Sequence, residues 1–292
     1  MVIQWFPGHM AKATREVKEK LKLVDIVFEL VDARCPLSSH NMYLDEVVKD
    51  KKKIIIFNKI DLCDRKETAK WKNYFENKGY VVVYTDAKNS NNLNKVIDKA
   101  KEELAEKIAR QVAKGIKPRA IRSMVIGVPN VGKSTFINKL IKKNVANTAN
   151  KPGVTKKQQW LKLNKDIELL DTPGILMPKF DNQKIGKKLS LIGSIKDDIT
   201  PLDDVSLYLI ELLKNNYLEN LNNHYKLNVK AEDENLTIME KIAEKRFKKI
   251  GGDYDYDSTI KLLIQDFRTQ KFGLITLDNY NEIVNNEESY ED

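Results

Sequence analysis

Short hydrophobic runs alternate with longer segments of mixed polarity along the first part of the chain. The runs are rich in β-branched residues and span residues 24–31, 53–57, 80–84 and 122–127. Continuous runs of this length are typical of buried strands in a mostly parallel sheet. The segments between them have the length of crossover helices and span residues 38–50, 64–78 and 91–113. This pattern predicts an α/β domain, to which residues 157–163 and 166–171 add a hairpin of strands.

The pattern changes after Pro178. Helical spacing dominates from there, and we expect helices at about residues 182–195, 203–216, 235–249 and 256–270. Asp203 and Ser258 are the expected caps of two of these helices. No segment in this part is typical of a strand. We therefore predict an α/β domain over residues 1–178 and an all-α domain over residues 179–292.

A further amphipathic helix is expected at the front of the chain, over residues 9–24. Its apolar positions recur at helical spacing and are Met10, Ala13, Val17, Leu21 and Val24. Its other faces carry the basic residues Lys12, Arg15, Lys18, Lys20 and Lys22. We expect this basic stripe to face solvent, and contact with RNA is the alternative.

Charge is unevenly divided between the two predicted domains. Residues 1–178 contain 35 Lys and Arg against 20 Asp and Glu, whereas residues 179–292 contain 16 against 22. A basic body can bind a polyanion, but Lys-rich surfaces also keep proteins soluble, and charge alone leaves both interpretations open. The chain of 292 residues has two cysteines, no signal-peptide pattern and no apolar run long enough for a bilayer. We therefore expect a cytoplasmic protein with no membrane partner.

Residues 127–134, GVPNVGKS, match the P-loop pattern and lie between an apolar strand and a predicted helix. Gly127 and Gly132 allow backbone N–H groups to curl around phosphate oxygens. Lys133 would reach the β- and γ-phosphates, and Ser134 would bind Mg²⁺. The expected nucleotide contacts in this segment are Asn130, Val131, Gly132, Lys133, Ser134 and Thr135.

Residues 171–174, DTPG, follow the apolar segment IELL. A carboxylate at the end of that strand could hold Mg²⁺ through water, which is the role expected of Asp171. Gly174 could bring its N–H close to the γ-phosphate. Upstream, Thr155 of Gly153-Val154-Thr155 could close on Mg²⁺ and the γ-phosphate, although a simple β-turn after Pro152 explains the same residues.

Residues 58–61, NKID, follow the strand KIIIF and form a candidate guanine-reading motif. Asp61 offers two acceptor oxygens to N1–H and the exocyclic amine of guanine, a donor pair that adenine lacks. Asn58 could bond the base edge and the neighbouring loop, and the Lys59 stem could cover the ring. After the next strand, Asp86, Ala87 and Lys88 occupy the place of a loop whose backbone N–H meets guanine O6, although Asp86 departs from the usual residue type.

These motifs resemble those of translation-factor-related GTPases. In most members the P-loop precedes NKxD, but here NKID comes first and no second NKxD follows Asp171. That order is the arrangement of circularly permuted GTPases. The front segment Pro7-Gly8-His9-Met10, the P-loop sequence and the length are similar to those of the YlqF/RbgA family, the bacterial ribosome biogenesis GTPases A. The resemblance covers essentially the whole chain.

The resemblance implies a site that binds GTP or GDP with Mg²⁺ and hydrolyses GTP. Ile175 stands where small GTPases use Gln to orient water, so another group must position the nucleophile. By resemblance His9 is the candidate, and capping of the first helix is the alternative. Related GTPases with Asn at the position of Asn130 bind K⁺ there, so K⁺ dependence is also expected. His40 and His224 have no motif around them and are expected to be ordinary surface or packing residues.

The resemblance further implies that the partner is a precursor of the large ribosomal subunit. The particle would accelerate hydrolysis late in assembly, and the protein would act as a monomer. The helical domain would bind ribosomal RNA, although a solvated helix face explains its basic residues equally well; these are Lys241, Lys245, Arg246, Lys248, Lys249, Lys261, Arg268 and Lys271. The alternatives are an ATP-using P-loop enzyme and a nucleotide-regulated RNA-binding scaffold with negligible turnover.

Overall fold

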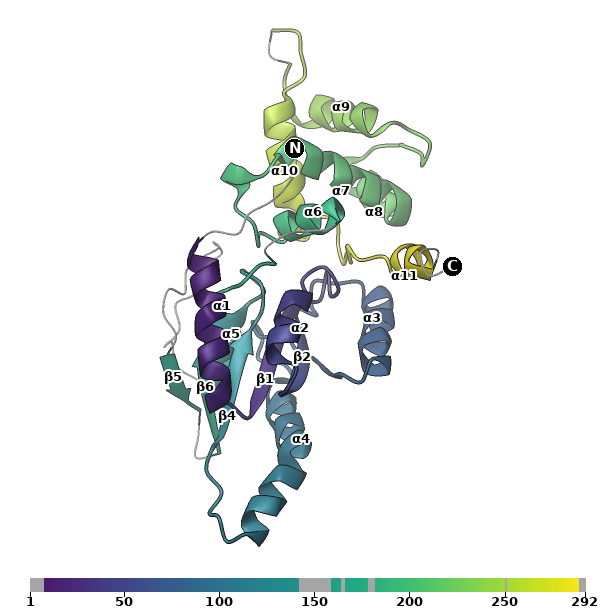
Figure 1. The fold of residues 1–292 in the computed structure, drawn as a ribbon. Helices are drawn as coiled ribbons and strands as arrows, with labels where there is room; N and C mark the ends of the chain where they lie inside the picture. The colour runs from purple at the N-terminus through teal and green to yellow at the C-terminus, as the bar shows by residue number, and fades with distance from the viewer. Residues whose placement is uncertain (1–7, 142–158, 164–165, 178–181, 250, 289–292) are drawn as a thin grey trace.

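The computed structural model describes residues 8–141, 159–163, 166–177, 182–249 and 251–288. Figure 1 shows an α/β part built on one sheet, with a layer of helices from the C-terminal half at one end of it. The mostly parallel α/β architecture with a helical C-terminal part is therefore confirmed. None of the helices in the described ranges is long and apolar enough to cross a membrane.

The sheet has six strands in the order β3-β2-β1-β4-β6-β5. All neighbouring pairs are parallel except β5 and β6, which are antiparallel. The strands are β1 (Ile26–Asp32), β2 (Lys52–Asn58), β3 (Val81–Tyr84), β4 (Ile121–Ile126), β5 (Gln159–Lys162) and β6 (Ile167–Asp171). Central strand β1 is buried along its whole length, in agreement with its mostly apolar sequence, and it carries the buried carboxylates Glu29 and Asp32.

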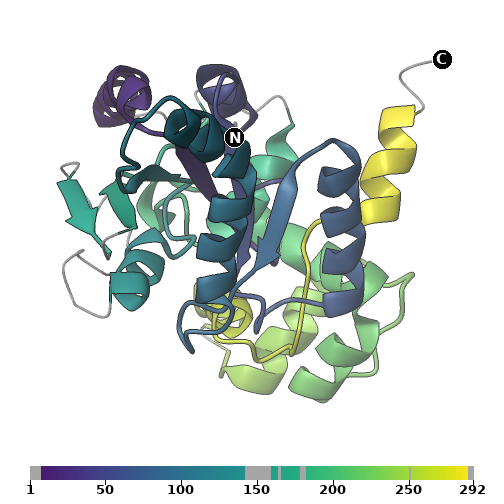
Figure 2. The same cartoon turned by 90° about the horizontal axis from the view of Figure 1, so that it is seen from below.

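Helices cover both faces of this sheet, as Figure 2 shows when the molecule is turned. The helices of the α/β part are α1 (Gly8–Lys20), α2 (Met42–Val48), α3 (Arg65–Asn77), α4 (Leu93–Ala113) and α5 (Lys133–Ile141). The predicted front helix is confirmed, but it ends earlier and continues as a 3₁₀ turn over Leu21–Leu23. Met10, Ala13 and Val17 of α1 are buried, as the helical spacing predicted.

The C-terminal part contains more helices than the sequence pattern predicted. They are α6 (Gln183–Leu191), α7 (Leu202–Asn216), α8 (Leu218–Tyr225), α9 (Asn235–Arg246), α10 (Tyr256–Arg268) and α11 (Tyr280–Glu288). The pattern missed α8 and α11, which are short. The two predicted caps are wrong: Pro201 precedes α7, and the N-cap of α10 is Asp255, whose carboxylate accepts from the Ser258 N–H. Asp203 and Ser258 lie in the first turns instead.

The end of the chain returns to the α/β part. The Leu277 N–H donates to the Arg34 carbonyl at 2.5 Å, and the Trp71 indole donates to the Asp278 carbonyl at 2.8 Å. The Asp278 carboxylate is fully buried and accepts from the Lys188 ammonium at 2.8 Å and the Ser38 hydroxyl at 2.6 Å. Helix α11 then packs on α3. The segment 275–278 is therefore a strap that ties the helical part to the sheet.

Candidate nucleotide-binding site

The polar residues predicted to bind a nucleotide lie at the carboxyl ends of the parallel strands. Asp32, Asn58 and Asp171 are the last residues of β1, β2 and β6. The P-loop connects β4 to α5, whose first residue is Lys133. Open α/β sheets bind ligands at this edge because every parallel strand delivers its following loop there. The circularly permuted order therefore does not prevent the motifs from meeting in space.

Asn58 connects three loops of the site. Its side-chain amide donates to the Val131 carbonyl at 2.8 Å, and its amide oxygen accepts from the Thr85 hydroxyl and the Ala87 N–H, both at 3.1 Å. Gly132 lies so close that a Cβ there would be 2.4 Å from the Asn58 amide nitrogen. The amide thus joins the base-reading loops to the P-loop, whereas the sequence had also suggested a bond to the base edge.

Lys59 lies above a buried carboxylate. Its ammonium is 2.6 Å from the Asn130 carbonyl and 2.9 Å from the Asp32 carboxylate. The Arg34 guanidinium binds the same carboxylate at 2.9 Å. These two cations hold the pKa of Asp32 far below its usual range despite complete burial. Asp32 and Arg34 therefore fix the lysine stem beside the pocket, although neither residue lies in a recognisable sequence motif.

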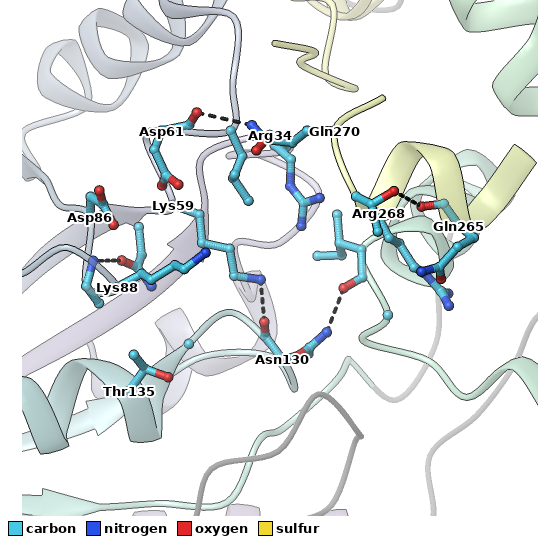
Figure 3. Close-up of a pocket in the computed structure, with 17 residues that line it drawn as sticks. Arg34, Lys59, Asp61, Asp86, Lys88, Asn130, Thr135, Gln265, Arg268 and Gln270 are labelled. Carbon is cyan, nitrogen blue, oxygen red and sulfur yellow. Dashed lines mark hydrogen bonds between the residues drawn. The ribbon is translucent and has the colours of Figure 1, made fainter. Parts of the chain in front are cut away.

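The pocket itself is a cavity of about 690 Å³ (Figure 3). On the sheet side it is lined by the predicted residues Asn58, Lys59, Asp61, Asp86, Ala87, Lys88, Asn130, Gly132 and Thr135. The Asp86 carboxylate accepts from the backbone and side-chain amides of Asn89 at 3.1 and 2.6 Å. This local turn explains why an Asp is tolerated where Ser or Thr is usual. A cavity of this size is in the range of ligand pockets.

The phosphate side of the site contains a lysine and a carboxylate whose charged forms are disfavoured by burial. Lys133 is 7% exposed, and its ammonium donates to the carbonyls of Gly127 and Val128 at 3.0 and 2.9 Å. Burial lowers the pKa of Lys133 to about 8 and raises the pKa of Asp171 to about 6. Neither Asp171 oxygen accepts a well-formed hydrogen bond from the described residues. A buried carboxylate without a donor fits a role in holding Mg²⁺, with Ser134 at the start of α5 as its predicted companion.

The segment after Asp171 presses directly against the P-loop. A Cβ on Gly174 would lie 2.7 Å from the Cα of Pro129, so a larger residue would displace the P-loop. The Ile175 N–H donates to the Gly127 carbonyl at 3.2 Å. The Ile175 side chain is fully buried in a cluster with Ala13 and Val17 of α1. It therefore faces the core, in agreement with the expectation that it cannot orient water.

Asn130 extends the P-loop toward the helical part. Its backbone is left-handed, with a φ of 63°, and its amide donates to the Ile192 carbonyl at 2.9 Å. The Ser194 hydroxyl donates to the Pro129 carbonyl at 2.6 Å. The turn after α6 is thus hydrogen-bonded to the P-loop at two points. The K⁺ role of Asn130 stays a prediction, as do the roles of Thr155 and of the His9 side chain, which lie outside the described residues.

A buried ion network lies beside the site and includes His40, which is an internal and not a surface residue. His40 is 3.0 Å from Glu29 and 2.9 Å from Asp45, and the Lys53 ammonium is 2.9 Å from Glu29. Burial opposes ionisation, but the neighbouring Glu29 raises the pKa of His40 to about 9. Glu29, His40 and Asp45 are residue types that can bind a metal ion. The Lys53 ammonium already provides a positive charge beside these carboxylates. This network anchors Asn41, whose amide donates to the Ile175 carbonyl at 2.9 Å.

Several pocket residues come from segments that carried no recognisable motif. They are Arg34, Leu62, Ile192, Gly193, Gln265, Arg268, Thr269 and Gln270. Arg268 is one of the basic residues for which RNA contact is an alternative, but its guanidinium bonds the carbonyls of Ser190 and Leu191 and the Asp197 carboxylate. Periodicity places α10, but no pattern in the sequence indicates that its end faces the base-reading loop. Long-range packing alone brings these residues together.

Comparisons with known proteins agree with this geometry. Residues 21–181 match the family model described as RsgA GTPase, and residues 122–245 match the model described as 50S ribosome-binding GTPase. The chain is 48% identical over 279 residues to "Ribosome biogenesis GTPase A" of Bacillus licheniformis, covering 95% of this chain and 98% of the relative. The fold is similar to GDP-bound TM YlqF, with a TM-score of 0.64, 28% identity and coverage of 91% of this chain and 100% of that one.

A second solved structure, GNP-bound YlqF from T. maritima, gives a TM-score of 0.62 at 28% identity, with coverage of 92% and 98%. Identity near one half over almost the full length of both chains leaves no large segment outside the match. The nucleotide motifs and their permuted order fall within that match. The chain therefore belongs to the ribosome biogenesis GTPase A family, and its enzymatic activity is the hydrolysis of GTP.

Proposed function

We propose that this GTPase acts late in the assembly of the large (50S) ribosomal subunit, as a cytoplasmic monomer. In this proposal, turnover is slow in the free protein and faster on the particle. The observation that carries it is the meeting of the NKID loop, the P-loop and Asp171 at one edge of the sheet, in a chain 48% identical to a ribosome biogenesis GTPase A. The names of the relatives support a ribosomal partner.

Each part of the site has a proposed role on the nucleotide. Asp61 accepts hydrogen bonds from N1–H and the exocyclic amine of guanine, which excludes adenine. Lys133 exchanges its bonds to Gly127 and Val128 for bonds to the β- and γ-phosphates. Bound Mg²⁺ would neutralise charge on the phosphate oxygens. Ser134, Asp171 and Thr155 would hold it. The favourable N-terminus of α5 faces the same phosphates.

The attacking water needs a group other than Ile175. The buried position of that side chain favours a water-positioning group from another segment. We propose His9, the second residue of α1, because an imidazole can orient water and accept a proton near neutral pH. We expect His9→Ala to lower turnover by about tenfold to a thousandfold while the Kd for GTP stays nearly unchanged. Equal losses in turnover and affinity would contradict the role.

A monovalent cation is the second proposed cofactor. Asn130 lies in the P-loop with its amide directed at the Ile192 carbonyl. K⁺ at this position would offset charge that develops on the transferred phosphate. Replacing K⁺ with Na⁺ at equal ionic strength should then reduce turnover. Identical rates in the two salts would remove K⁺ from the mechanism.

The helical part is the proposed RNA-binding and signalling domain. We propose that residues 1–178 form the GTPase domain and residues 179–292 the C-terminal domain. The segment after Gly174 leads directly into the helical part, and the turn after α6 bonds the P-loop. Ordering of the segment by GTP would therefore reorient the C-terminal domain. Indistinguishable small-angle scattering profiles of the GDP and GTP-analogue forms would contradict this.

The second candidate function is a nucleotide-regulated RNA-binding scaffold that needs only slow intrinsic hydrolysis, and the burial of Ile175 favours it. The deciding experiment measures multiple-turnover phosphate release with and without purified large subunits. Our proposal expects slow release that large subunits accelerate and small subunits do not. Slow release that large subunits leave unchanged, together with tight GTP binding, would favour the scaffold.

A further inference from the structure

The nucleotide pocket has a second wall that belongs to the helical part. Gln265, Arg268, Thr269 and Gln270 at the end of α10 line the same cavity as Asp61 and Lys59 (Figure 3). More than 130 residues of sequence separate this wall from the P-loop. A ligand that fills the cavity would therefore touch both parts of the chain.

The end of α10 is held in place from two sides. The Arg268 guanidinium donates to the Ser190 and Leu191 carbonyls at 2.8 and 3.0 Å, and these belong to the end of α6. On the other side, the Gln270 side-chain amide donates to the Asp61 carbonyl at 3.2 Å. Gln270 adopts a left-handed backbone with a φ of 61°. The second wall is therefore attached directly to the base-reading loop.

The charge of this wall suits the sugar better than the phosphates. A helix C-terminus carries partial negative charge and disfavours anions. The two guanidinium groups nearby are already bound to carboxylates, Arg34 to Asp32 at 2.9 Å and Arg268 to Asp197 at 2.7 Å. The phosphates have their own cations in Lys133 and the predicted Mg²⁺. Uncharged hydroxyl groups are therefore the chemistry that fits the end of α10.

Two side chains on this wall can receive hydroxyl groups. Gln265 and Thr269 are exposed and line the cavity. The Thr269 hydroxyl donates to the Gln265 carbonyl at 2.8 Å, so its oxygen keeps lone pairs for a further donor. The Gln265 amide offers both a donor and an acceptor. Ribose hydroxyls have the same dual character.

We propose that the end of α10 binds the ribose hydroxyls of the guanine nucleotide through Gln265 and Thr269, so that the C-terminal helices complete the GTP site. This inference rests on the nucleotide placement proposed above. By linkage, the nucleotide then stabilises the docked position of the C-terminal helices by the same factor as the docked helices strengthen nucleotide binding.

Calorimetry on the full chain with Mg²⁺ tests the proposal. The experiment removes the ribose hydroxyls from the ligand and, separately, the two polar side chains from the protein. The ligands are GDP and 2′,3′-dideoxy-GDP, and the protein variants are Gln265→Ala/Thr269→Val and the control Gln111→Ala, which lies near the far end of α4. We expect the wild type and the control to bind GDP about tenfold more tightly than the dideoxy ligand. In the double variant this preference should fall below about twofold.

Different failures have different meanings. A double variant that keeps the full preference for GDP, or a wild type with none, would overturn the ribose contact. Equal weakening of both ligands by the double variant would also overturn it, because the side chains would then act on the pocket in general. A wild type that binds no guanine nucleotide would instead overturn the proposed function. Unlabelled ligands are required, because a fluorophore attached to the ribose would occupy the proposed contact.

Discussion

The base-reading side and the phosphate side of the nucleotide site are built differently. Around the base, the polar groups already bond one another: Asn58 bonds Val131, Thr85 and Ala87, and Lys59 bonds Asp32. Around the phosphates, Lys133 and Asp171 are buried at shifted pKa values of about 8 and about 6. The first side is pre-organised, whereas the second carries an electrostatic penalty that a magnesium nucleotide can relieve.

This difference shows that some residues of the site stabilise the fold without a ligand, whereas others destabilise the fold and serve ligand binding. On the base side, the hydrogen bonds of Asn58 and the Lys59–Asp32 ion pair are already formed, so they stabilise the protein before any ligand arrives. Charged groups on the phosphate side lower the free energy of unfolding in the absence of ligand, because burial disfavours both ions. Removal of a hydrogen bond that is already formed on the base side should therefore lower stability, whereas removal of a buried charge on the phosphate side should raise it. Both changes should weaken nucleotide binding.

The largest effect is expected where the two sides touch. Gly132→Ala places a Cβ 2.4 Å from the Asn58 amide at a φ of +99°, and it should lower the free energy of unfolding by about 2–4 kcal/mol. GDP affinity should fall about a hundredfold, because the P-loop and the base-reading loops separate. Denaturant unfolding and calorimetry measure the two effects.

Gly79→Ala is the matched control for this substitution. Gly79 has a similar φ of +84° but open space around its Cβ position. It should cost only the strain of the left-handed backbone, about 1–2 kcal/mol, and leave GDP affinity unchanged. Equal behaviour of the two variants would show that the Asn58 contact does not join the two sides.

Asp61→Asn tests the base side alone. Loss of the carboxylate removes a charge-assisted pair of hydrogen bonds, so GDP affinity should fall about tenfold to a hundredfold. Affinity for xanthosine diphosphate should rise, because xanthine presents an oxygen where guanine presents its amine. Stability should hardly change, since Asp61 lines the cavity and is only partly buried. Unchanged base preference would contradict the assignment of Asp61.

Asp171→Asn tests the phosphate side. The raised pKa of about 6 means that Asp171 favours the folded state below pH 4 and loses this contribution as the pH rises through 6. At pH 7.5 without ligand, the variant should therefore be more stable than the wild type, by about 2–3 kcal/mol. Thermal unfolding measures this gain, and a variant less stable than the wild type would contradict the penalty.

The same carboxylate should make nucleotide binding depend on pH. Mg²⁺ requires the ionised form, so wild-type affinity for GTP with Mg²⁺ should fall by up to about tenfold per pH unit below pH 6. Asp171→Asn should bind more weakly at pH 7.5 but lose this slope. Calorimetry between pH 5 and 8 compares the two profiles, and parallel slopes would place the titrating group elsewhere.

Thr85→Val should have the smallest effect. It removes one of the bonds to the Asn58 amide oxygen, at 3.1 Å, and leaves the Ala87 N–H bond in place. We expect a loss of about 1 kcal/mol in the free energy of unfolding and about a twofold loss in GDP affinity. A loss as large as that of Gly132→Ala would show that Asn58 depends on Thr85 for its orientation.

Sequence patterns predicted the strands, the α5 P-loop context and the front helix because hydrophobic periodicity and glycine spacing are local properties. Asn58, Asp61 and Lys133 could be predicted as nucleotide contacts because such roles require particular residue types next to particular strand ends. Asp32 and Arg34 escaped notice because their function is to hold Lys59, which is a contact across strands. Gln265 lines the cavity only because of the way in which the helical part packs on the sheet, and no local sequence pattern encodes that arrangement.

The strap contacts Trp71, whose intrinsic fluorescence can report on the position of the strap. The Trp71 indole donates to the Asp278 carbonyl and is fully buried, with the ring of Tyr280 5.2 Å away. Any rearrangement that lifts the chain terminus from α3 would hydrate this indole and shift its emission. Stopped-flow fluorescence of a variant that retains Trp71 alone among the tryptophans would therefore show whether nucleotide exchange moves α11 away from α3, and how fast.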